Sequence, residues 1–320
     1  MKKILIIGSN GFIGRNLIRS INLINKKIYL IDKINPSRND LIFIRENKIS
    51  FKKIDITKIK ELKKIAKIDF DVVYHLASVV GVAKVLDPEK TINIIINGSK
   101  NVIDHLVKKK TLLVFFSTSE IYGNNINLPW KEEDPMLLGS YKSPRWNYAK
   151  SKSLVESIIY ERSKKKKFKF LILRLFNIYG PYQSKFFITP NIILNCLKNK
   201  TCYLNYPTTQ TRCFTYIDDL CDFLIKLPSK KKIISGVYNI GNNKKTKIKD
   251  YINLIIKLTK SKSKVKINKF KMMNKIYIQD VIHRQPDITK INKVYRWKPK
   301  TDILTGLIKT IDFFNKSSQQ

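Results

Sequence analysis

The chain has 320 residues, 43% of them hydrophobic and 11% aromatic, which is enough apolar material for a large buried core and argues against a disordered chain. Lysine and arginine outnumber aspartate and glutamate by 63 to 24, so the formal net charge is +39. No apolar run approaches the ~20 residues of a membrane span, and Gly8 and Asn10 end the first apolar run short of a signal peptide, which indicates a cytoplasmic protein with no membrane partner.

The positive charge is scattered along the chain. Its densest runs are Lys108–Lys110, Lys164–Lys167 and Lys230–Lys232, and none is interleaved with aromatic residues as single-strand nucleic-acid binders require. A polyanion partner is one interpretation of such a charge. We favour the other interpretation, a compositional bias towards lysine, and predict no specific nucleic-acid partner.

The four cysteines, Cys196, Cys202, Cys213 and Cys221, lie in the second half of the chain. None forms a Cys-x-x-Cys motif and no histidine is close to them in sequence, so the pattern is not typical of a zinc site. We predict buried free thiols in a reducing compartment and no metal site.

Short apolar runs alternate with amphipathic ones through the first half of the chain. Several of the short runs are continuously apolar, as expected for strands buried on both faces of a sheet. Between them, apolar residues recur at helical spacing, for example from Phe12 to Ile21. The alternation predicts an α/β fold with a Rossmann-type, doubly wound parallel sheet. The predicted strands span residues 3–8, 27–32, 49–55, 71–77, 112–119 and 168–176.

After residue 177 the pattern loosens, and prolines interrupt it repeatedly. A strand at 236–241 and a helix at 246–259 are expected to rejoin the sheet. The predicted organisation is a main domain of residues 1–180, rejoined by about 236–260, a smaller C-terminal domain of residues 181–235 and 262–300, and a last helix over 302–315.

The sequence GSNGFIG comes directly after the first predicted strand and opens the first predicted helix. Its Gly8, Gly11 and Gly14 let the backbone turn tightly and approach a pyrophosphate, which the free N–H groups of the helix N-terminus can bind. Asp32 ends the second strand, where its carboxylate can accept both ribose hydroxyls and would repel a 2′-phosphate. Asp55 ends the third strand, where an adenine edge would lie. The pattern therefore predicts NAD as the cofactor, in preference to NADP.

Further motifs occur in order along the chain, and together they resemble the extended short-chain dehydrogenase/reductase family, the nucleotide-sugar epimerases and dehydratases. They are the glycine turn, Asp32, DIT, HLAS, STSEIYG, Tyr-x-x-x-Lys, RLFNIYGP, QTRCFTYIDDL and HRQPDI. The resemblance covers nearly the whole chain. It implies an NAD-binding main domain, a substrate-binding smaller domain and a nucleotide-sugar substrate, with a UDP-sugar expected. The cofactor-binding residues that it implies are Gly8, Gly11, Phe12, Ile13, Gly14, Asp32, Asp55, Ile56, Leu76, Ala77, Ser78, Tyr148 and Lys152.

The motif Tyr-x-x-x-Lys occurs three times, starting at Tyr29, Tyr148 and Tyr160. Tyr29 lies in a predicted strand and Tyr160 near the end of a helix, so only Tyr148 fits the family position. Tyr148 and Lys152 share a helix face. A tyrosine of reference pKa ~10 is a poor base, and we expect the adjacent ammonium to lower that pKa. Thr118, at the end of the fifth strand, would hydrogen-bond the reacting oxygen.

The residues after Thr118 indicate the fate of the sugar once C4 has been oxidised, which is the first step that the resemblance implies. The 4,6-dehydratases usually have an Asp-Glu pair there, whereas this chain has Ser119 and Glu120. The 4-epimerases usually have small, uncharged residues. The segments STSEIYG and PRWNYAKSK resemble those of UDP-glucuronate decarboxylases instead. We predict this activity, with a UDP-hexose 4-epimerase as the alternative and a non-catalytic NAD-binding scaffold as a remote one.

The resemblance also implies the residues that hold the substrate. Arg284, in HRQPDI, matches the substrate-site arginine of the decarboxylases, and we predict it as the proton donor or the carboxylate contact, with Glu120 as its polar partner. Asn177 and Arg212 match positions that hold the diphosphate, a task that suits the donor fork of arginine. The predicted catalytic residues are thus Thr118, Glu120, Tyr148 and Lys152.

The resemblance implies, finally, a homodimer. Dimers of the family pair the helix around residues 91–109 with the one at 148–163, and the apolar residues Leu154, Val155, Ile158 and Ile159 exceed what one buried face of the second helix needs.

Overall fold

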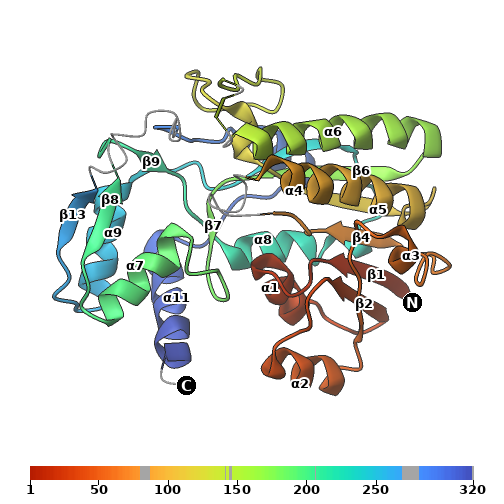
Figure 1. Cartoon of the computed structure of the whole chain (residues 1–320), viewed down its shortest axis with the longest axis horizontal. Helices are drawn as coiled ribbons and strands as arrows, with labels where there is room; N and C mark the ends of the chain where they lie inside the picture. Colours follow the sequence, from red (N-terminus) through yellow and green to blue (C-terminus); the bar gives the residue numbers. More distant parts are fainter. Residues whose placement is uncertain (80–86, 141, 144–145, 206, 269–280, 319–320) are drawn as a thin grey trace. The chain divides into compact units, whose positions relative to one another are not determined.

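The computed structural model describes residues 1–79, 87–140, 142–143, 146–205, 207–268 and 281–318. Figure 1 shows the helices and strands coloured along the chain. Two compact units are present, the first formed by Met1–Ile121, Asn147–Arg174 and Cys221–Tyr238, the second by Tyr122–Trp146, Leu175–Leu220 and Asn239–Gln320. The domain boundaries that the sequence suggests stay a prediction. Two stretches used in the sequence analysis, residues 144–145 and 269–280, lie outside the described residues.

A seven-stranded sheet confirms the predicted α/β fold. Its order, β3-β2-β1-β4-β5-β6-β11, is the doubly wound order of a Rossmann-type fold with one added strand. Strand β1 pairs in parallel with both β2 and β4, and the pairs β2·β3 and β4·β5 are also parallel. The strands are β1 (Lys2–Ile7), β2 (Lys26–Asp32), β3 (Ser50–Lys53), β4 (Val72–His75), β5 (Leu112–Thr118), β6 (Lys169–Leu175) and β11 (Gly236–Ile240).

The strand order reverses between β1 and β4, because the chain leaves β3 on one side and re-enters the sheet at β4 on the other. In open α/β sheets the crevice at this switch point, outside the carboxyl ends of the strands, is where ligands bind. The segments directly after β1 and β4 are the glycine-rich turn and HLAS, so the topology places both motifs at the same edge of the sheet.

Helices connect the strands, and α1, α5 and α6 lie where the sequence predicts a helix. In Figure 1, α5 and α6 lie side by side over the sheet. The helices of this part are α1 (Phe12–Ser20), α2 (Arg38–Glu46), α3 (Ile59–Leu62), α4 (Pro88–Ile92), α5 (Gly98–Leu106), α6 (Trp146–Lys166) and α8 (Ile217–Leu224), with a π-helical stretch at Asn93–Asn97 and 3₁₀ turns at Ser119–Tyr122 and Leu227–Ser229.

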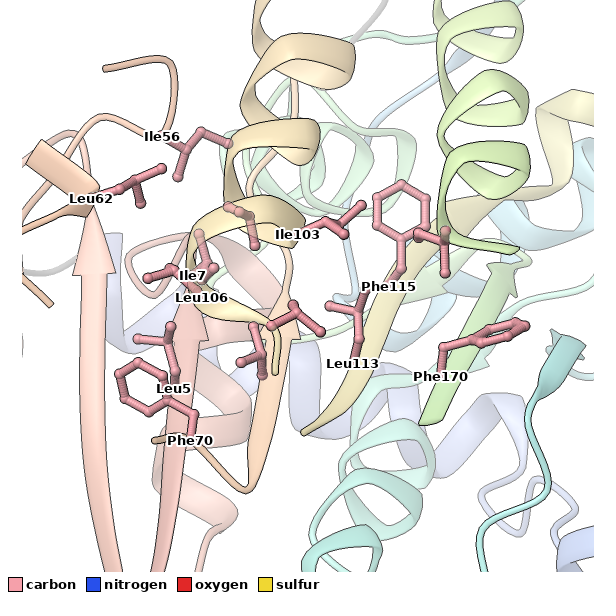
Figure 2. Packing of buried hydrophobic residues seen from close by; sticks show 14 of the residues in the cluster. Leu5, Ile7, Ile56, Leu62, Phe70, Ile103, Leu106, Leu113, Phe115 and Phe170 are labelled. Carbon is pink, nitrogen blue, oxygen red and sulfur yellow. The ribbon is translucent and has the colours of Figure 1, made fainter. Parts of the chain in front are cut away.

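The main hydrophobic core lies between this sheet and the helices α3, α5 and α6. Leu5, Val73 and Leu113 contribute from the strands, and Ile103 and Ile159 from the helices, all of them fully buried. Figure 2 shows part of this cluster. Burying each such side chain stabilises the fold by about 1.5–3 kcal/mol. The apolar runs of the sequence are therefore continuous because the central strands are covered by protein on both faces.

The second unit is built from short strand pairs and helices. Two of its helices were predicted within a few residues: α9 spans Ile248–Leu258 and α11 spans Ile303–Ser318. Phe214 stacks on Tyr251 with ring centroids 3.7 Å apart. The remaining elements are α7 (Ile188–Leu197), α10 (Thr289–Tyr295), the parallel pairs β7 (Ile178–Tyr179) with β10 (Thr215–Tyr216) and β8 (Cys202–Asn205) with β13 (Val265–Asn268), and the antiparallel pair β9 (Thr211–Arg212) with β12 (Thr246–Lys247).

The four cysteines are buried free thiols, as predicted. Cys196 and Cys202 approach each other to 3.6 Å between sulfur atoms, and burial raises the pKa of Cys202 to about 12. Among the described residues, no three histidine, cysteine or acidic side chains are grouped to hold a metal ion. No helix in the described ranges has the length and apolar character of a membrane span.

Candidate active site

The glycine-rich turn fits a backbone that must pass close to its neighbours. Gly8 has φ +83°, and a Cβ there would meet the backbone nitrogen of Ala77 at 2.7 Å. A Cβ on Gly14 would meet the carbonyl oxygens of Ser9 and Gly8 at 2.6 and 2.7 Å. Gly11 is the N-cap of α1 and carries no capping side chain. The first N–H groups of α1, starting at Phe12 and Ile13, are thus left to a ligand, and this cradle fits a pyrophosphate.

Asp32 ends β2 next to this turn. One carboxylate oxygen accepts the backbone N–H of Asn10 at 3.0 Å, and the other accepts that of Ile34 at 3.2 Å. The two bonds fix the carboxylate against the glycine-rich turn, while the residue stays partly exposed. This is the place that the sequence assigns to the acid that accepts the ribose hydroxyls.

Asp55 lies two residues beyond the end of β3 rather than in it. Its carboxylate accepts the backbone N–H and the hydroxyl of Thr57 at 2.9 and 2.8 Å, and its own N–H donates to Glu61 at 2.7 Å. Strand β3 ends at Lys53, before the predicted end at residue 55, because these local bonds form the turn that leads into α3. The neighbouring Ile56 is buried against Gly98, where a Cβ would approach its side chain to 2.7 Å.

The segment after β4 lies against both the glycine-rich turn and Tyr148. The N–H of Leu76 donates to the carbonyl of Ile7 at 2.9 Å, which continues the pairing of β4 with β1. The backbone of Ala77 lies against Gly8. Ser78, predicted as a cofactor contact, hydrogen-bonds the hydroxyl of Tyr148. The sequence missed this contact, because nothing local links residue 78 to residue 148.

Tyr148 lies in the first turn of α6 and is partly buried. Its hydroxyl hydrogen-bonds the side chains of Thr118, at the end of β5, and Ser78. The structure thus brings Thr118 close to the phenolic oxygen, and its predicted bond to the reacting oxygen of a substrate stays a prediction.

The pKa of Tyr148 differs from the expectation. Burial raises it above its usual value, the nearby charge of Glu120 raises it further, and the bonds from Thr118 and Ser78 only partly oppose this. We expected Lys152 to lower the pKa of Tyr148. The physical reason for the difference is that an acidic neighbour and loss of water both favour the neutral phenol.

Lys152 lies one turn further along α6, and its side chain is 2% exposed. The ammonium donates to the carbonyl of Phe116 at 2.7 Å and lies 4.5 Å from the ring centroid of Phe115. Burial lowers the pKa of Lys152 to about 7, and the charge of Glu156 acts in the opposite direction. A lysine poised near neutrality is typical of functional sites.

In the second unit, Asn177 comes after β6 with a φ of +39°, an uncommon conformation for a residue with a side chain. Its carbonyl accepts the N–H of Thr215 at 3.1 Å. Its side-chain oxygen is buried, with no hydrogen-bond partner among the described residues. A strained backbone and an unused buried acceptor together are typical of a ligand-binding position.

The two predicted substrate arginines of this unit lie on neighbouring segments. Thr211 forms a parallel bridge with His283, and the hydroxyl of Thr211 lies 3.0 Å from the ring nitrogen Nδ1 of His283. Arg212 donates to the carbonyl of Ile282 at 2.9 Å. Arg212 and Arg284 are both almost completely buried. The structure therefore brings together the two backbone segments that carry these arginines, which are 72 positions apart in sequence.

A second set of bonds fixes the segment that carries Arg284. The backbone N–H of Trp130 donates to the carbonyl of Gln285 at 2.8 Å, and the carbonyl of Trp130 accepts the backbone N–H of Asp287 at 2.7 Å. The side chain of Asn239 donates to the carbonyl of Trp130 at 2.9 Å and accepts the hydroxyl of Tyr122 at 2.7 Å. Sequence reasoning missed this network, because a buried tryptophan and asparagine have no distinctive spacing.

Comparisons with known proteins find relatives along nearly the whole chain. Residues 4–241 match the family described as NAD dependent epimerase/dehydratase. The chain is 28% identical to a UDP-N-acetyl-alpha-D-glucosaminuronate decarboxylase of Bacillus cytotoxicus, over 98% of each protein. It is 34% identical to the bifunctional polymyxin resistance protein ArnA of Wigglesworthia glossinidia brevipalpis, over 98% of this chain but only 51% of that protein. A solved UDP-glucuronic acid 4-epimerase from Bacillus cereus, in complex with UDP-glucuronic acid and NAD, is 26% identical with a TM-score of 0.85, over 98% of this chain and 99% of the other.

Proposed function

This chain belongs to the NAD-dependent epimerase/dehydratase family, and we propose that it decarboxylates a UDP-linked hexuronic acid, with UDP-glucuronate as the first candidate. The family makes it an NAD-dependent enzyme that modifies nucleotide sugars. The narrower proposal concerns what happens to the sugar after its oxidation at C4.

One observation carries this proposal: Glu120 lies close enough to Tyr148 for its charge to raise the pKa of the phenol. An acidic group at this point of the site is unlike the small, uncharged residues that epimerases usually have there. Ser119 stands where dehydratases usually have an aspartate. The relative from Bacillus cytotoxicus that is 28% identical along its whole length is named as a decarboxylase of a UDP-linked uronic acid.

The first step falls to the residues of the first unit. When bound, NAD⁺ supplies the hydride acceptor for C4 of the sugar. Gly8, Gly11 and Gly14 would hold its pyrophosphate at the N-terminus of α1, and Asp32 its ribose hydroxyls. In its phenolate form, Tyr148 takes the proton of the C4 hydroxyl and becomes the neutral phenol that its surroundings favour. Thr118 holds the hydroxyl of Tyr148 in place through its hydrogen bond.

Loss of CO₂ then needs little from the protein. Oxidation at C4 turns the C5 carboxylate into part of a β-keto acid, and the electrons left by departing CO₂ are taken up as an enolate. The side chains have to orient the carboxylate and return a proton to carbon. We propose Arg284 as the carboxylate contact or proton donor and Glu120 as its polar partner. Asn177 and Arg212 are proposed to hold the diphosphate.

A 4-epimerase acting on the same substrate is the second candidate. The structural likeness to the UDP-glucuronic acid 4-epimerase of Bacillus cereus favours it. Both candidates share C4 oxidation with Tyr148 as the base, and they differ in whether the 4-keto sugar loses CO₂ or is reduced again with its carboxylate still in place.

The experiment is incubation of the purified chain with NAD⁺ and a panel of sugar nucleotides, with release of CO₂ and product mass as the readouts. The panel contains UDP-glucuronate, its N-acetylated 2-amino form, UDP-glucose and UDP-N-acetylglucosamine. We expect CO₂ and a UDP-pentose, or its 4-keto form, from UDP-glucuronate. Formation of UDP-galacturonate without CO₂ would select the epimerase, and turnover of only the neutral sugars would contradict both candidates.

A further inference from the structure

A second polar cluster lies beneath the catalytic pair, in the same unit. Glu156 accepts the hydroxyl of Ser117 at 2.5 Å and the guanidinium of Arg174 at 2.7 Å. The three side chains come from α6, β5 and β6, and each is more than nine-tenths buried. Removing two charges from water is costly, so such a pair is weak evidence for stability alone. Its position invites another explanation.

Glu156 lies four residues after Lys152 on α6, so the two side chains share a helix face. Ser117 immediately precedes Thr118 on β5, and the carbonyl of Phe116, the residue before it, accepts the ammonium of Lys152. The cluster therefore touches both elements that carry the catalytic groups, α6 through Glu156 and β5 through Ser117.

We propose that Glu156, fixed by Arg174 and Ser117, is a positioning residue that keeps Lys152 protonated and holds α6 against the catalytic end of β5. The role rests on the proposed use of Tyr148 and Lys152 in sugar oxidation. Glu156 acts through Lys152 and makes no contact with the substrate.

Among the residues that the structure describes, the other titratable groups around Lys152 do not supply this charge. His75, from β4, is completely buried, and burial and the charge of Lys152 lower its pKa to about 3, so it stays neutral. Tyr148 is kept neutral by its raised pKa. Arg174, from β6, is a cation and cannot supply a negative charge. Glu156 is thus the negative charge that opposes the loss of the Lys152 proton.

A double-mutant cycle tests this inference without a substrate. Thermal unfolding of the whole chain is measured from pH 5.5 to 9 for the wild type, Glu156→Gln, Lys152→Met and the combination. Burial lowers the pKa of Lys152 in the folded chain to about 7, whereas its ordinary value is 10.5. The unfolded chain therefore binds this proton more tightly, and the stability of the fold decreases as pH falls towards 7. We expect Glu156→Gln to lower the pKa of Lys152 in the folded chain further, because it removes the negative charge of Glu156. The decrease in Tm caused by Glu156→Gln should therefore become larger as pH falls below about 7. In chains that already carry Lys152→Met, the change in Tm caused by Glu156→Gln should not depend on pH.

A substrate-dependent readout adds to the cycle. In the pH profile of kcat, the alkaline limb, where Lys152 loses its proton, should move to lower pH by about one unit or more in Glu156→Gln, while KM is unchanged. If the wild type oxidises no sugar nucleotide, the proposed function fails and the thermal cycle still decides this inference. An effect of Glu156→Gln on Tm that is the same at every pH, with or without Lys152, would overturn it.

Glu156→Gln leaves Arg174 without its carboxylate and can fail to fold. The variant Glu156→Leu/Arg174→Met removes both buried charges, an exchange that other buried ion pairs tolerate. We expect this double variant to fold and its kcat to fall at the same lowered pH as in Glu156→Gln. A folded double variant whose kcat falls at the same pH as in the wild type would show that the cluster acts only on structure, and would also overturn the inference.

Discussion

Helix α6 contains two Tyr-x-x-x-Lys motifs, and their comparison shows how little the spacing decides. Near the start of the helix, Tyr148 is partly buried and bonded to Thr118, and Lys152 is enclosed by the protein. Near its end, Tyr160 is 53% exposed, and the ammonium of Lys164 lies 4.0 Å from its ring centroid in solvent. The same four-residue step thus produces a buried polar site and an ordinary surface contact.

The two lysines differ in the direction of their pKa shifts. Burial lowers the pKa of Lys152 to about 7, whereas a hydrogen bond from Lys164 to Glu161 raises the pKa of Lys164. A group that can gain or lose a proton near neutrality is useful in proton transfer. The difference comes from the strands under the start of α6, since β5 supplies the carbonyl and the ring next to Lys152, and β6 supplies Arg174, which pairs with Glu156.

Among the substitutions that test the difference between the two motifs, Tyr148→Phe should have the largest effect. We expect sugar oxidation to fall by about 10²–10⁴-fold, because the base for the C4 proton is gone. The matched control, Tyr160→Phe, should leave the rate unchanged. The measurement is the NADH absorbance formed with the best substrate of the panel. Equal rates for Tyr148→Phe and the wild type would remove Tyr148 from the mechanism.

Lys152→Met is expected to lower the activity of the protein and to raise the stability of its fold. In the folded chain Lys152 binds its proton more weakly than in the unfolded chain, so its cost to stability is complete below about pH 7 and is lost as pH rises towards 10.5. Replacing it should slow oxidation yet stabilise the fold at pH 7 by roughly 1–3 kcal/mol, after allowance for the lost bond to Phe116. Denaturant unfolding at pH 7 and pH 10 measures this. Lys164→Met, the control, should change neither quantity.

Glu120→Gln and Arg284→Ala sharpen the comparison by separating early from late steps. Each should slow CO₂ release by about 10- to 150-fold, the loss expected for one charge-assisted contact of ~1.5–3 kcal/mol, while NADH still forms. Glu120→Gln should also lower the pKa of Tyr148 and move the acidic limb of oxidation to lower pH, since Glu120 raises that pKa. Glu161→Gln, beside the second motif, is the control. Loss of NADH formation in Arg284→Ala would contradict the late role.

Much of the first unit was predictable because its strands are buried on both faces. Continuous apolar runs gave β1, β2 and β5 to within about two residues. Residues Thr246–Lys247 were predicted as helix, but they form β12, since they pair with Thr211–Arg212 far away in sequence. Local patterns contain no signal for such a pairing.

The candidate site was predictable where a motif has a fixed position, and not where long-range packing decides. Gly8, Asp32 and Tyr148 could be identified from their places after strands or at a helix start. Glu156 resembles a solvated helix glutamate in sequence, and only the approach of Arg174 from β6 reveals it as buried. The rise in the pKa of Tyr148 likewise depends on enclosure, which no spacing expresses.

The smallest effect on the chemistry is expected from Leu154→Glu, on the same helix. Leu154 is 49% exposed although its neighbour Val155 is fully buried, and Ile92 of α4 is 45% exposed. The family resemblance implies a homodimer that covers these helices, and exposed apolar residues of this kind are typical of such an interface. A carboxylate at position 154 should shift the chain from dimer to monomer in light scattering at micromolar concentration. Since Leu154 faces away from Thr118 and Lys152, the rate of NADH formation per chain should stay within about twofold of the wild type. A wild type that is already monomeric would disprove the dimer, and a large loss of rate in a folded monomer would show that the two ends of α6 are not independent.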